Sequence, residues 1–174
     1  MEELSSAFVK FVTNITGPAW TLLWTLGLLI ALILTARIFS RAAQGITVPG
    51  RASVTGGEVI SVLIISALLA NYSGWISTVS NSVGLGDATY GQISYIDNGG
   101  SLGKFAAVIN SAMTFASLMG GIYGFKGLLL LHKSASGGGG QGQDLIWKAI
   151  THIIFGGLLV RIAQFMSIAS NTVS

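Results

Sequence analysis

The chain contains 174 residues, of which 51% are apolar and only 9% are charged, whereas an ordinary globular domain carries about 25% charged residues. So few ionic groups could hardly cover a water-exposed surface of this size, and the composition therefore favours a membrane protein. The lack of cysteine excludes a disulfide framework and a thiolate metal site, and the net charge of +3 comes without the dense basic patch of a nucleic-acid-binding surface.

The first apolar run predicts a membrane-spanning helix near the amino terminus. No charged residue occurs between Lys10 and Arg37, and Pro18–Ala36 forms the apolar centre of this stretch. A bilayer core of about 30 Å requires roughly 20 helical residues, so the run is long enough to cross it. Pro18 suits the first turn of that helix, where its missing N–H costs least.

Three further runs have a comparable length. The second has Val59–Val79 as its uncharged core, and the third spans Phe105–Phe125, which Leu128–Leu131 could extend. The fourth, Leu145–Ser170, is apolar but contains three basic side chains, namely Lys148, His152 and Arg161. We therefore expect an all-α membrane protein with about four apolar helices.

The distribution of lysine and arginine predicts the orientation of these helices. The connections that follow the first and third runs hold most of the cations: Arg37, Arg41, Arg51, Lys126, Lys133 and Lys148. The amino-terminal tail carries only Lys10, and the connection between the second and third runs carries only Lys104. The positive-inside rule then places the basic connections in the cytoplasm and both termini outside. We expect two tandem helical hairpins with basic cytoplasmic tips, over residues 1–100, which include an extracytoplasmic loop, and 101–174.

The amino terminus raises the question of a signal peptide. Its first ten residues, MEELSSAFVK, hold two acids and one base, and no small-x-small cleavage site follows the first run. A classical signal peptide is therefore not expected. A longer leader that ends near SALLANYS, after the second run, is the alternative, so processing of the first hairpin stays open.

The two halves of the chain share a short sequence. ISTVSNSVG (76–84) follows the second run and MSIASNTVS (166–174) follows the fourth, and four positions are identical: Ser77/Ser167, Ser80/Ser170, Asn81/Asn171 and Val83/Val173. The match indicates a duplicated unit of helix, basic tip, helix and Ser/Asn-rich exit. Because small polar residues commonly cap membrane helices, a chance match is the alternative interpretation.

Glycine is over-represented, with 24 residues, and many of these lie inside the apolar runs. In a soluble helix each would cost about 1 kcal/mol relative to alanine, but in membrane helices small residues let neighbouring backbones approach closely. The third and fourth runs hold the candidate packing positions: Gly120, Gly121, Gly124, Gly127, Gly156 and Gly157. We expect these glycines to form tight helix contacts within or between chains.

Arg161 lies near the middle of the fourth run, where a charge at bilayer depth costs about 2.5–3.5 kcal/mol on insertion scales. Three interpretations stay open. Arg161 faces an aqueous lumen, a lipid headgroup or a subunit interface inside an assembly, or it extends toward the membrane surface because the helix starts late, or it takes part in a proton or ion relay. At 100° per residue it points away from Lys148 and His152, so these basic residues do not form one stripe.

The sequence offers no residues for catalysis or for a resident cofactor. His132 and His152 are the only histidines, and with no cysteine and few acids near them a metal site is not expected. No serine–histidine–acid set or pair of carboxylates can be assembled. The tryptophans lie near the ends of the runs, as aromatic anchors at a membrane surface do: Trp20, Trp24, Trp75 and Trp147.

One stretch resembles a known family. SLGKFAAVINSAMTFASLMGGIYGFKGLLLLHKSASGG (101–138), followed by AITHIIFGGLLVRIAQF (149–165), has a Ser-Leu-Gly entry, an aromatic-Gly-aromatic turn in IYGFKG and a His-Lys exit. These features resemble the small hydrophobic membrane proteins of type IVB secretion and IncI-type conjugation systems, the IcmC/DotE, IcmD/DotP and TraQ/TraR group. The second hairpin also resembles a conjugative pilin, with two apolar helices, a short basic cytoplasmic tip and outward termini.

The resemblance implies a non-enzymatic subunit of a DNA- or effector-transfer apparatus, which self-associates or joins other secretion subunits in the inner membrane and could polymerise into an extracellular pilus. In conjugative pilin assemblies lipid can line the lumen, with basic residues facing its headgroups. The corresponding candidates here are Lys126, Lys133, Lys148 and Arg161, with phospholipid as the one bound molecule considered and no specific nucleic-acid site. Two alternatives stay open, a small transporter or channel and a holin-like pore former.

Overall fold

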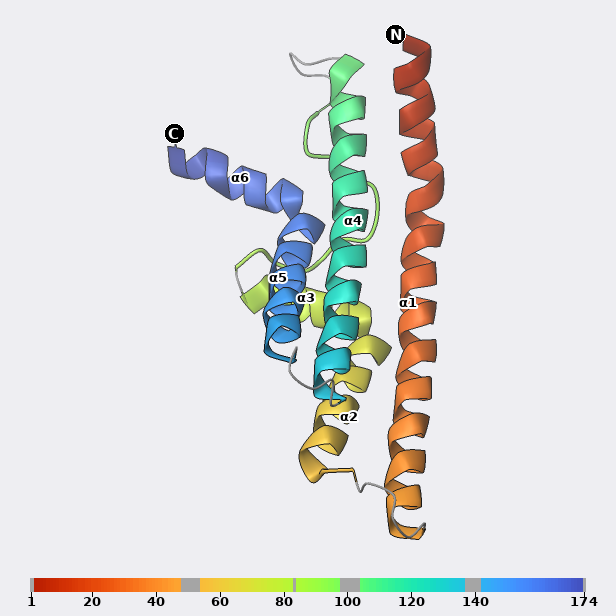
Figure 1. Cartoon of the computed structure of the whole chain (residues 1–174). Coiled ribbons are helices and arrows are strands. Elements are labelled where there is room, and N and C mark those ends of the chain that lie inside the picture. Colours follow the sequence, from red (N-terminus) through yellow and green to blue (C-terminus); the bar gives the residue numbers. More distant parts are fainter. Residues whose placement is uncertain (1, 48–53, 83, 98–103, 137–141, 174) are drawn as a thin grey trace.

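The computed structural model describes residues 2–47, 54–82, 84–97, 104–136 and 142–173, and every regular element in these ranges is a helix (Figure 1). The helices are α1 (Glu2–Thr47), α2 (Gly56–Ala70), α3 (Tyr72–Ser82), α4 (Lys104–Ala135), α5 (Gly142–Val160) and α6 (Ile162–Val173). By length and composition α1, α4 and α5 can each cross a bilayer, and α2 with α3 passes the same test as one bent pair. The expectation of an all-helical chain is confirmed, and the described residues hold three candidate spans, or four with the bent pair, where about four were expected.

Helix α1 is far longer than the predicted first span. Its 46 residues correspond to about 69 Å, more than twice a bilayer core. Pro18 lies inside α1 rather than in its first turn, so the predicted start of this helix was wrong. Threonine hydroxyls reinforce the helix on both sides of the proline: Thr16 donates to the Val12 carbonyl at 2.6 Å and Thr21 to the Gly17 carbonyl at 3.1 Å. Such hydroxyls help a proline-containing helix continue.

The second apolar run is bent, not straight as predicted. Helix α2 ends at Ala70, α3 begins at Tyr72, and the two axes differ by 93°. The Asn71 N–H still donates to the Ala67 carbonyl at 3.1 Å, so Asn71 caps α2. Buried Tyr72 then holds α3 across the bundle, because its hydroxyl donates to the Gly121 carbonyl of α4.

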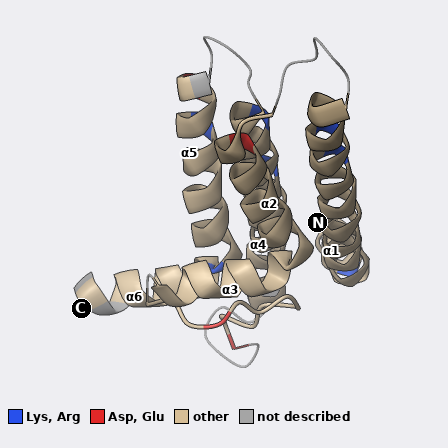
Figure 2. Ribbon diagram, turned by 90° about the horizontal axis from the view of Figure 1, so that it is seen from below, with Lys and Arg blue, Asp and Glu red and all other residues tan. Residues whose placement is uncertain are grey.

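The fourth run is also broken, against the prediction of one helix over Leu145–Ser170. Helix α5 ends at Val160 and α6 begins at Ile162, and α6 turns away from α5 (Figures 1 and 2). The Val160 carbonyl at the break accepts a hydrogen bond from Ser117 of α4 at 2.9 Å. A side chain from another helix therefore satisfies the group that the break leaves without an intrahelical donor.

The helices share one buried core. Helix α4 packs along α5, and α1 packs on both α2 and α4. The largest buried side chains come from both halves of the chain: Trp20, Leu69, Tyr72, Leu128 and Val160. The division at residue 100 and the two-hairpin arrangement with cytoplasmic tips stay predictions, while the core itself joins residues on both sides of that division.

Glycines set the distance between α4 and α5. A β-carbon added at Gly156 would lie 2.6 Å from the Gly124 backbone nitrogen and 2.7 Å from the Gly120 carbonyl oxygen. A β-carbon at Gly127 would lie 2.9 Å from the Ala149 carbonyl oxygen. Since no real β-carbon approaches backbone atoms so closely, the two helices touch through their main chains only because these positions are glycine.

The outer face of the bundle remains apolar. Large side chains of α1 are 42–61% exposed along the middle of the helix: Leu22, Leu28, Leu29, Leu32 and Ile33. Charged residues colour only a few turns of the ribbon (Figure 2). An exposed apolar surface of this kind fits contact with lipid or with another subunit, in line with a membrane protein.

Neighbouring glycines provide a test of the α4–α5 contact. We expect Gly156→Ala to lower the free energy of unfolding by about 1–3 kcal/mol, because the added methyl group meets backbone atoms of α4 that cannot move aside. Gly157→Ala is the matched control, since its β-carbon would lie 3.6 Å from the nearest atom, an ordinary contact. Thermal unfolding in detergent, followed by circular dichroism, measures both variants, and equal losses would contradict the packing described here.

Candidate functional site

The connection after α3 folds back onto the bundle, and we call residues 84–97 the 84–97 segment. Gly84 and Gly86 adopt positive φ angles of 76° and 74°, a conformation that glycine tolerates best. The Leu85 N–H donates to the Ser80 carbonyl at 3.0 Å, which closes the turn. The Ala88 N–H donates to the Ser77 hydroxyl of α3 at 3.3 Å. The segment therefore starts its return path tied to the helix it has just left.

Two buried side chains of α4 bind the backbone of this segment. The Asn110 side-chain oxygen accepts from the Tyr95 and Ile96 N–H groups, each at 3.0 Å, and its NH2 group donates to the Ile96 carbonyl at 2.9 Å. The Thr114 hydroxyl accepts from the Ile93 N–H at 2.9 Å. These side chains therefore supply hydrogen bonds that the irregular backbone of the segment does not make to itself.

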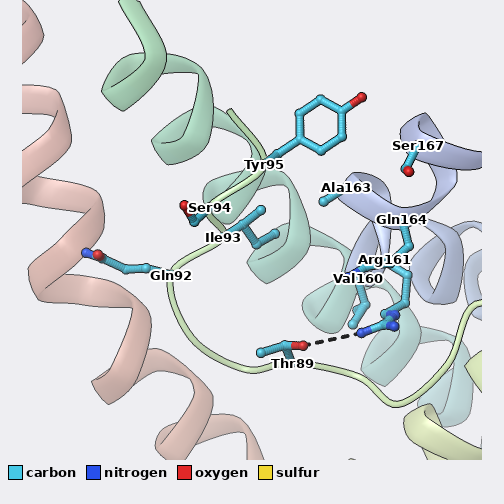
Figure 3. A pocket seen from close by; sticks show the side chains of 10 residues that line it. All are labelled: Thr89, Gln92, Ile93, Ser94, Tyr95, Val160, Arg161, Ala163, Gln164 and Ser167. Atoms are coloured by element: carbon cyan, nitrogen blue, oxygen red, sulfur yellow. Dashed lines mark hydrogen bonds between the residues drawn. The ribbon is translucent and has the colours of Figure 1, made fainter. Parts of the chain in front are cut away.

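Arg161 ties the same segment to the break between α5 and α6. Its side chain is only 5% exposed, and Nε donates to the Leu85 carbonyl at 3.1 Å. Nη2 donates to the same carbonyl, and Nη1 donates to the Thr89 hydroxyl at 3.3 Å (Figure 3). Within the chain, Arg161 is thus a buried cation held by a carbonyl and a hydroxyl, and its three predicted environments stay predictions.

No ion pair to Arg161 is found within the described ranges, where the ion pair present joins Arg41 and Glu58 at 2.6 Å. Asp87 lies in the 84–97 segment, but its carboxylate accepts a hydrogen bond from the Asn81 side chain at 2.6 Å. Asp87 therefore influences Arg161 only through space. The guanidinium charge is solvated by the protein but is not neutralised by direct contact.

A cavity of about 390 Å³ opens beside Arg161 (Figure 3). Its walls come from the 84–97 segment and from the α5–α6 break: Thr89, Gln92, Ile93, Ser94, Tyr95, Val160, Arg161, Ala163, Gln164 and Ser167. A second cavity of about 260 Å³ lies toward α1 and shares Gln92, Ile93 and Ser94. Most polar groups on these walls are neutral, so Arg161 supplies the charge of the first cavity.

Aromatic side chains pack next to this region. Trp20, Trp24 and Tyr90 form a cluster, with the Tyr90 ring 4.9 Å from Trp20 and 5.4 Å from Trp24 between centroids. The Tyr90 hydroxyl donates to the Ser73 carbonyl, and burial raises the pKa of Tyr90 above its ordinary value. Trp20 is fully buried against Gly121, and it therefore packs in the core instead of facing the membrane surface.

The predicted lysine candidates lie elsewhere. Lys126 and Lys133 are exposed on the second half of α4, and Lys148 is exposed in the first half of α5. Arg161 follows the opposite end of α5 and is buried, so the structure does not bring it together with the three lysines. Of the glycine candidates, Gly121 receives Trp20, and Gly157 makes only an ordinary contact with Val79.

Sequence reasoning missed the residues that hold the 84–97 segment. Asn110 and Thr114 are four residues apart, and Ser117 follows three residues later, so all three share one face of α4. A polar stripe inside an apolar run is the signal that could have identified them, because buried polar groups need partners. Its partner segment is irregular and could not be recognised from the sequence.

Within the described ranges, no group of three or more His, Asp or Glu side chains is arranged to hold a metal ion. Comparisons with protein-family models, with curated proteins and with solved structures found no match. The cavity beside Arg161, with the segment that closes it, is the candidate site on geometric grounds.

The hold of α4 on the segment can be measured directly. We expect Asn110→Leu to speed hydrogen exchange at the Tyr95 and Ile96 amides about tenfold or more, because their acceptor is lost and an unsatisfied buried group costs about 1–3 kcal/mol. Asn14→Leu, at an exposed position on α1, is the control and should leave these amides unchanged. Unaltered exchange in the Asn110 variant would show that the segment is held by other contacts.

Proposed function

We propose that the chain is a non-enzymatic structural subunit of a type IV secretion or conjugation apparatus of the IVB-like class, located in a bacterial inner membrane. The observation that carries the proposal is the use of its buried polar side chains. Asn110, Thr114 and Arg161 bind the chain's own 84–97 segment, which is the behaviour of a scaffold. The apolar outer face of α1 is left for lipid, for further copies or for other subunits.

The proposed topology follows from the charges and the helix lengths. Arg37 and Arg41 lie near the carboxyl end of α1, and Lys133 lies in the last turn of α4. The positive-inside rule places this end of the bundle in the cytoplasm and makes two tandem hairpins with both termini outside. A span of roughly 20 residues from Arg37 reaches the region of Pro18, so the first part of α1 projects about 24 Å beyond the bilayer.

This projecting part supports an assembly role. It carries exposed apolar side chains, with Leu4 79%, Phe11 53% and Ile15 37% exposed. The amino-terminal part of α1 runs beside the first turns of α4, beyond the level of α3 (Figure 1). Apolar groups outside the bilayer require a protein neighbour to cover them. A second copy of the chain, in an oligomer or a filament, or another subunit of the apparatus would supply that cover.

A small transporter or channel is the second candidate, because Arg161 lines a polar cavity inside the bundle. The two functions differ in what Arg161 does. A transporter loses flux in the Arg161→Leu variant while its assembly is unaffected, whereas a structural subunit shows no substrate-dependent flux in proteoliposomes with or without Arg161.

Single cysteines test the topology, since the natural chain has none. We expect an impermeant maleimide to label Leu4→Cys in intact cells, because the amino terminus lies outside. Arg41→Cys and Lys133→Cys should react only after the inner membrane is made permeable. Labelling of positions 41 and 133 from opposite sides would overturn the two-hairpin arrangement.

Deletion of the reading frame from its host tests the function itself. We expect the deletion to abolish conjugative transfer or secretion. In the undeleted host, we expect cross-linking in membranes to give multimers of the full chain. The double variant Lys133→Glu/Lys148→Glu should also reduce transfer, because each cytoplasmic lysine contributes about 1 kcal/mol of attraction to an anionic lipid surface. Lys10→Glu, on the other side, is the control. A chain that stays monomeric in mild detergent and whose deletion leaves transfer intact is not such a subunit.

A further inference from the structure

The cavity beside Arg161 combines a buried positive charge with space for a ligand. Arg161 is 5% exposed, and the contacts of its guanidinium within the described ranges are to a carbonyl and a hydroxyl, neither of which carries charge. Taking an ion out of water costs several kcal/mol unless an opposite charge or sufficient hydrogen bonds compensate. The Asp87 carboxylate, held by Asn81 at 2.6 Å, makes no direct contact. An anion in the cavity would complete the compensation.

Arg161 retains donors for such an anion. A guanidinium has five N–H groups, and the contacts to Leu85 and Thr89 use three of them. The planar guanidinium suits a phosphate better than a compact charged group does, because its two terminal nitrogens can donate to two phosphate oxygens at once. Arg161 can therefore keep its hold on the 84–97 segment and still donate to a ligand.

The first turn of α6 adds a second source of positive potential. Helix α6 begins at Ile162, directly after Arg161, and Ala163 and Gln164 line the cavity. The N–H groups of a first helical turn have no intrahelical acceptor, and the helix dipole makes this end attractive to anions. Two residues of this first turn, Ala163 and Gln164, and the Arg161 side chain thus border the same space.

The remaining walls fit a phosphate that belongs to a larger polar molecule. Around the charge lie neutral hydrogen-bonding groups, including Ser94, Gln92 and Ser167. The volume of about 390 Å³ exceeds what one phosphate fills and lies within the range of small-molecule sites, roughly 300–1,000 Å³. Hydroxyls next to the phosphate, as in a glycerol headgroup, would find partners there.

We infer that this cavity is a binding site for a phosphate group, with Arg161 as its charged ligand and the amino-terminal turn of α6 as its second support. The phosphate belongs either to the headgroup of an anionic phospholipid or to a free phosphate compound. The inference goes beyond the proposed function and does not require it, because the site lies within one chain.

Gln164→Glu is the decisive variant. It keeps the shape of the side chain, three residues after Arg161, but places a carboxylate in the cavity, where it competes with the phosphate. A negative charge in the first turn of a helix also favours folding, so the variant is expected to fold. Gln143→Glu makes the same chemical change at an exposed position near the start of α5 and is the matched control.

Two arms distinguish the sources of the phosphate. In the first, the full chain is reconstituted in nanodiscs of phosphatidylglycerol or of phosphatidylcholine, extracted, and examined for retained lipid by native mass spectrometry. In the second, the detergent-purified chain is titrated with inorganic phosphate by calorimetry. We expect retained phosphatidylglycerol or bound phosphate in the wild type and in Gln143→Glu, and binding at least about tenfold weaker in Gln164→Glu, which corresponds to about 1.4 kcal/mol.

The pattern across the arms gives the source or overturns the site. Retention of phosphatidylglycerol alone identifies a lipid headgroup, and binding of inorganic phosphate alone identifies a free phosphate compound. Equal binding by Gln164→Glu and the wild type, or no binding in either arm, overturns the inference. Because neither arm measures transfer, failure here leaves the proposed function standing, and failure of the transfer experiment leaves this site standing.

Discussion

The contact between α4 and α5 at Gly120, Gly124 and Gly156 is the constraint on which the other features depend. Because Gly120 and Gly156 lack a β-carbon, the backbones of α4 and α5 touch at this point, where Gly156 meets Gly120 and Gly124. The Val160 carbonyl is thereby brought within hydrogen-bond distance of a serine on α4. The end of α5 is then held where Arg161 can reach the 84–97 segment. Wider spacing of these helices would remove both contacts.

The two broken runs meet at the same segment. Helix α3 follows the break at Asn71 and α6 follows the break at Arg161, and both carry the short repeated sequence. Two matching serines contact or border the 84–97 segment. Ser77 accepts a backbone hydrogen bond from it, and Ser167 lines the cavity beside it. Ser77 and Ser167 thus both lie next to the 84–97 segment, while the duplication of the two halves stays a prediction.

A division of roles between the interior and the exterior follows from this arrangement. Inside, the polar side chains Asn110, Thr114 and Arg161 hold the irregular backbone of the 84–97 segment. Outside, α1 presents a long apolar face that its own chain leaves uncovered. The first feature suits a rigid component and the second suits a component with neighbours. The charged cavity adds a place where a phosphate-bearing molecule can join the same scaffold.

Composition and hydropathy determined the helical class and the apolar spans, because these depend on the average character of about 20 neighbouring residues. Glycine spacing likewise indicated the helices that pack closely. The bends at Asn71 and Arg161 were not predictable, since uncharged residues continue across the first and apolar residues continue across the second. Two contacts accompany those bends: Tyr72 binds α4, and Arg161 binds the 84–97 segment. Such contacts join residues about 50 to 76 positions apart, so only the tertiary structure decided where the helices turn and where the cavity lies.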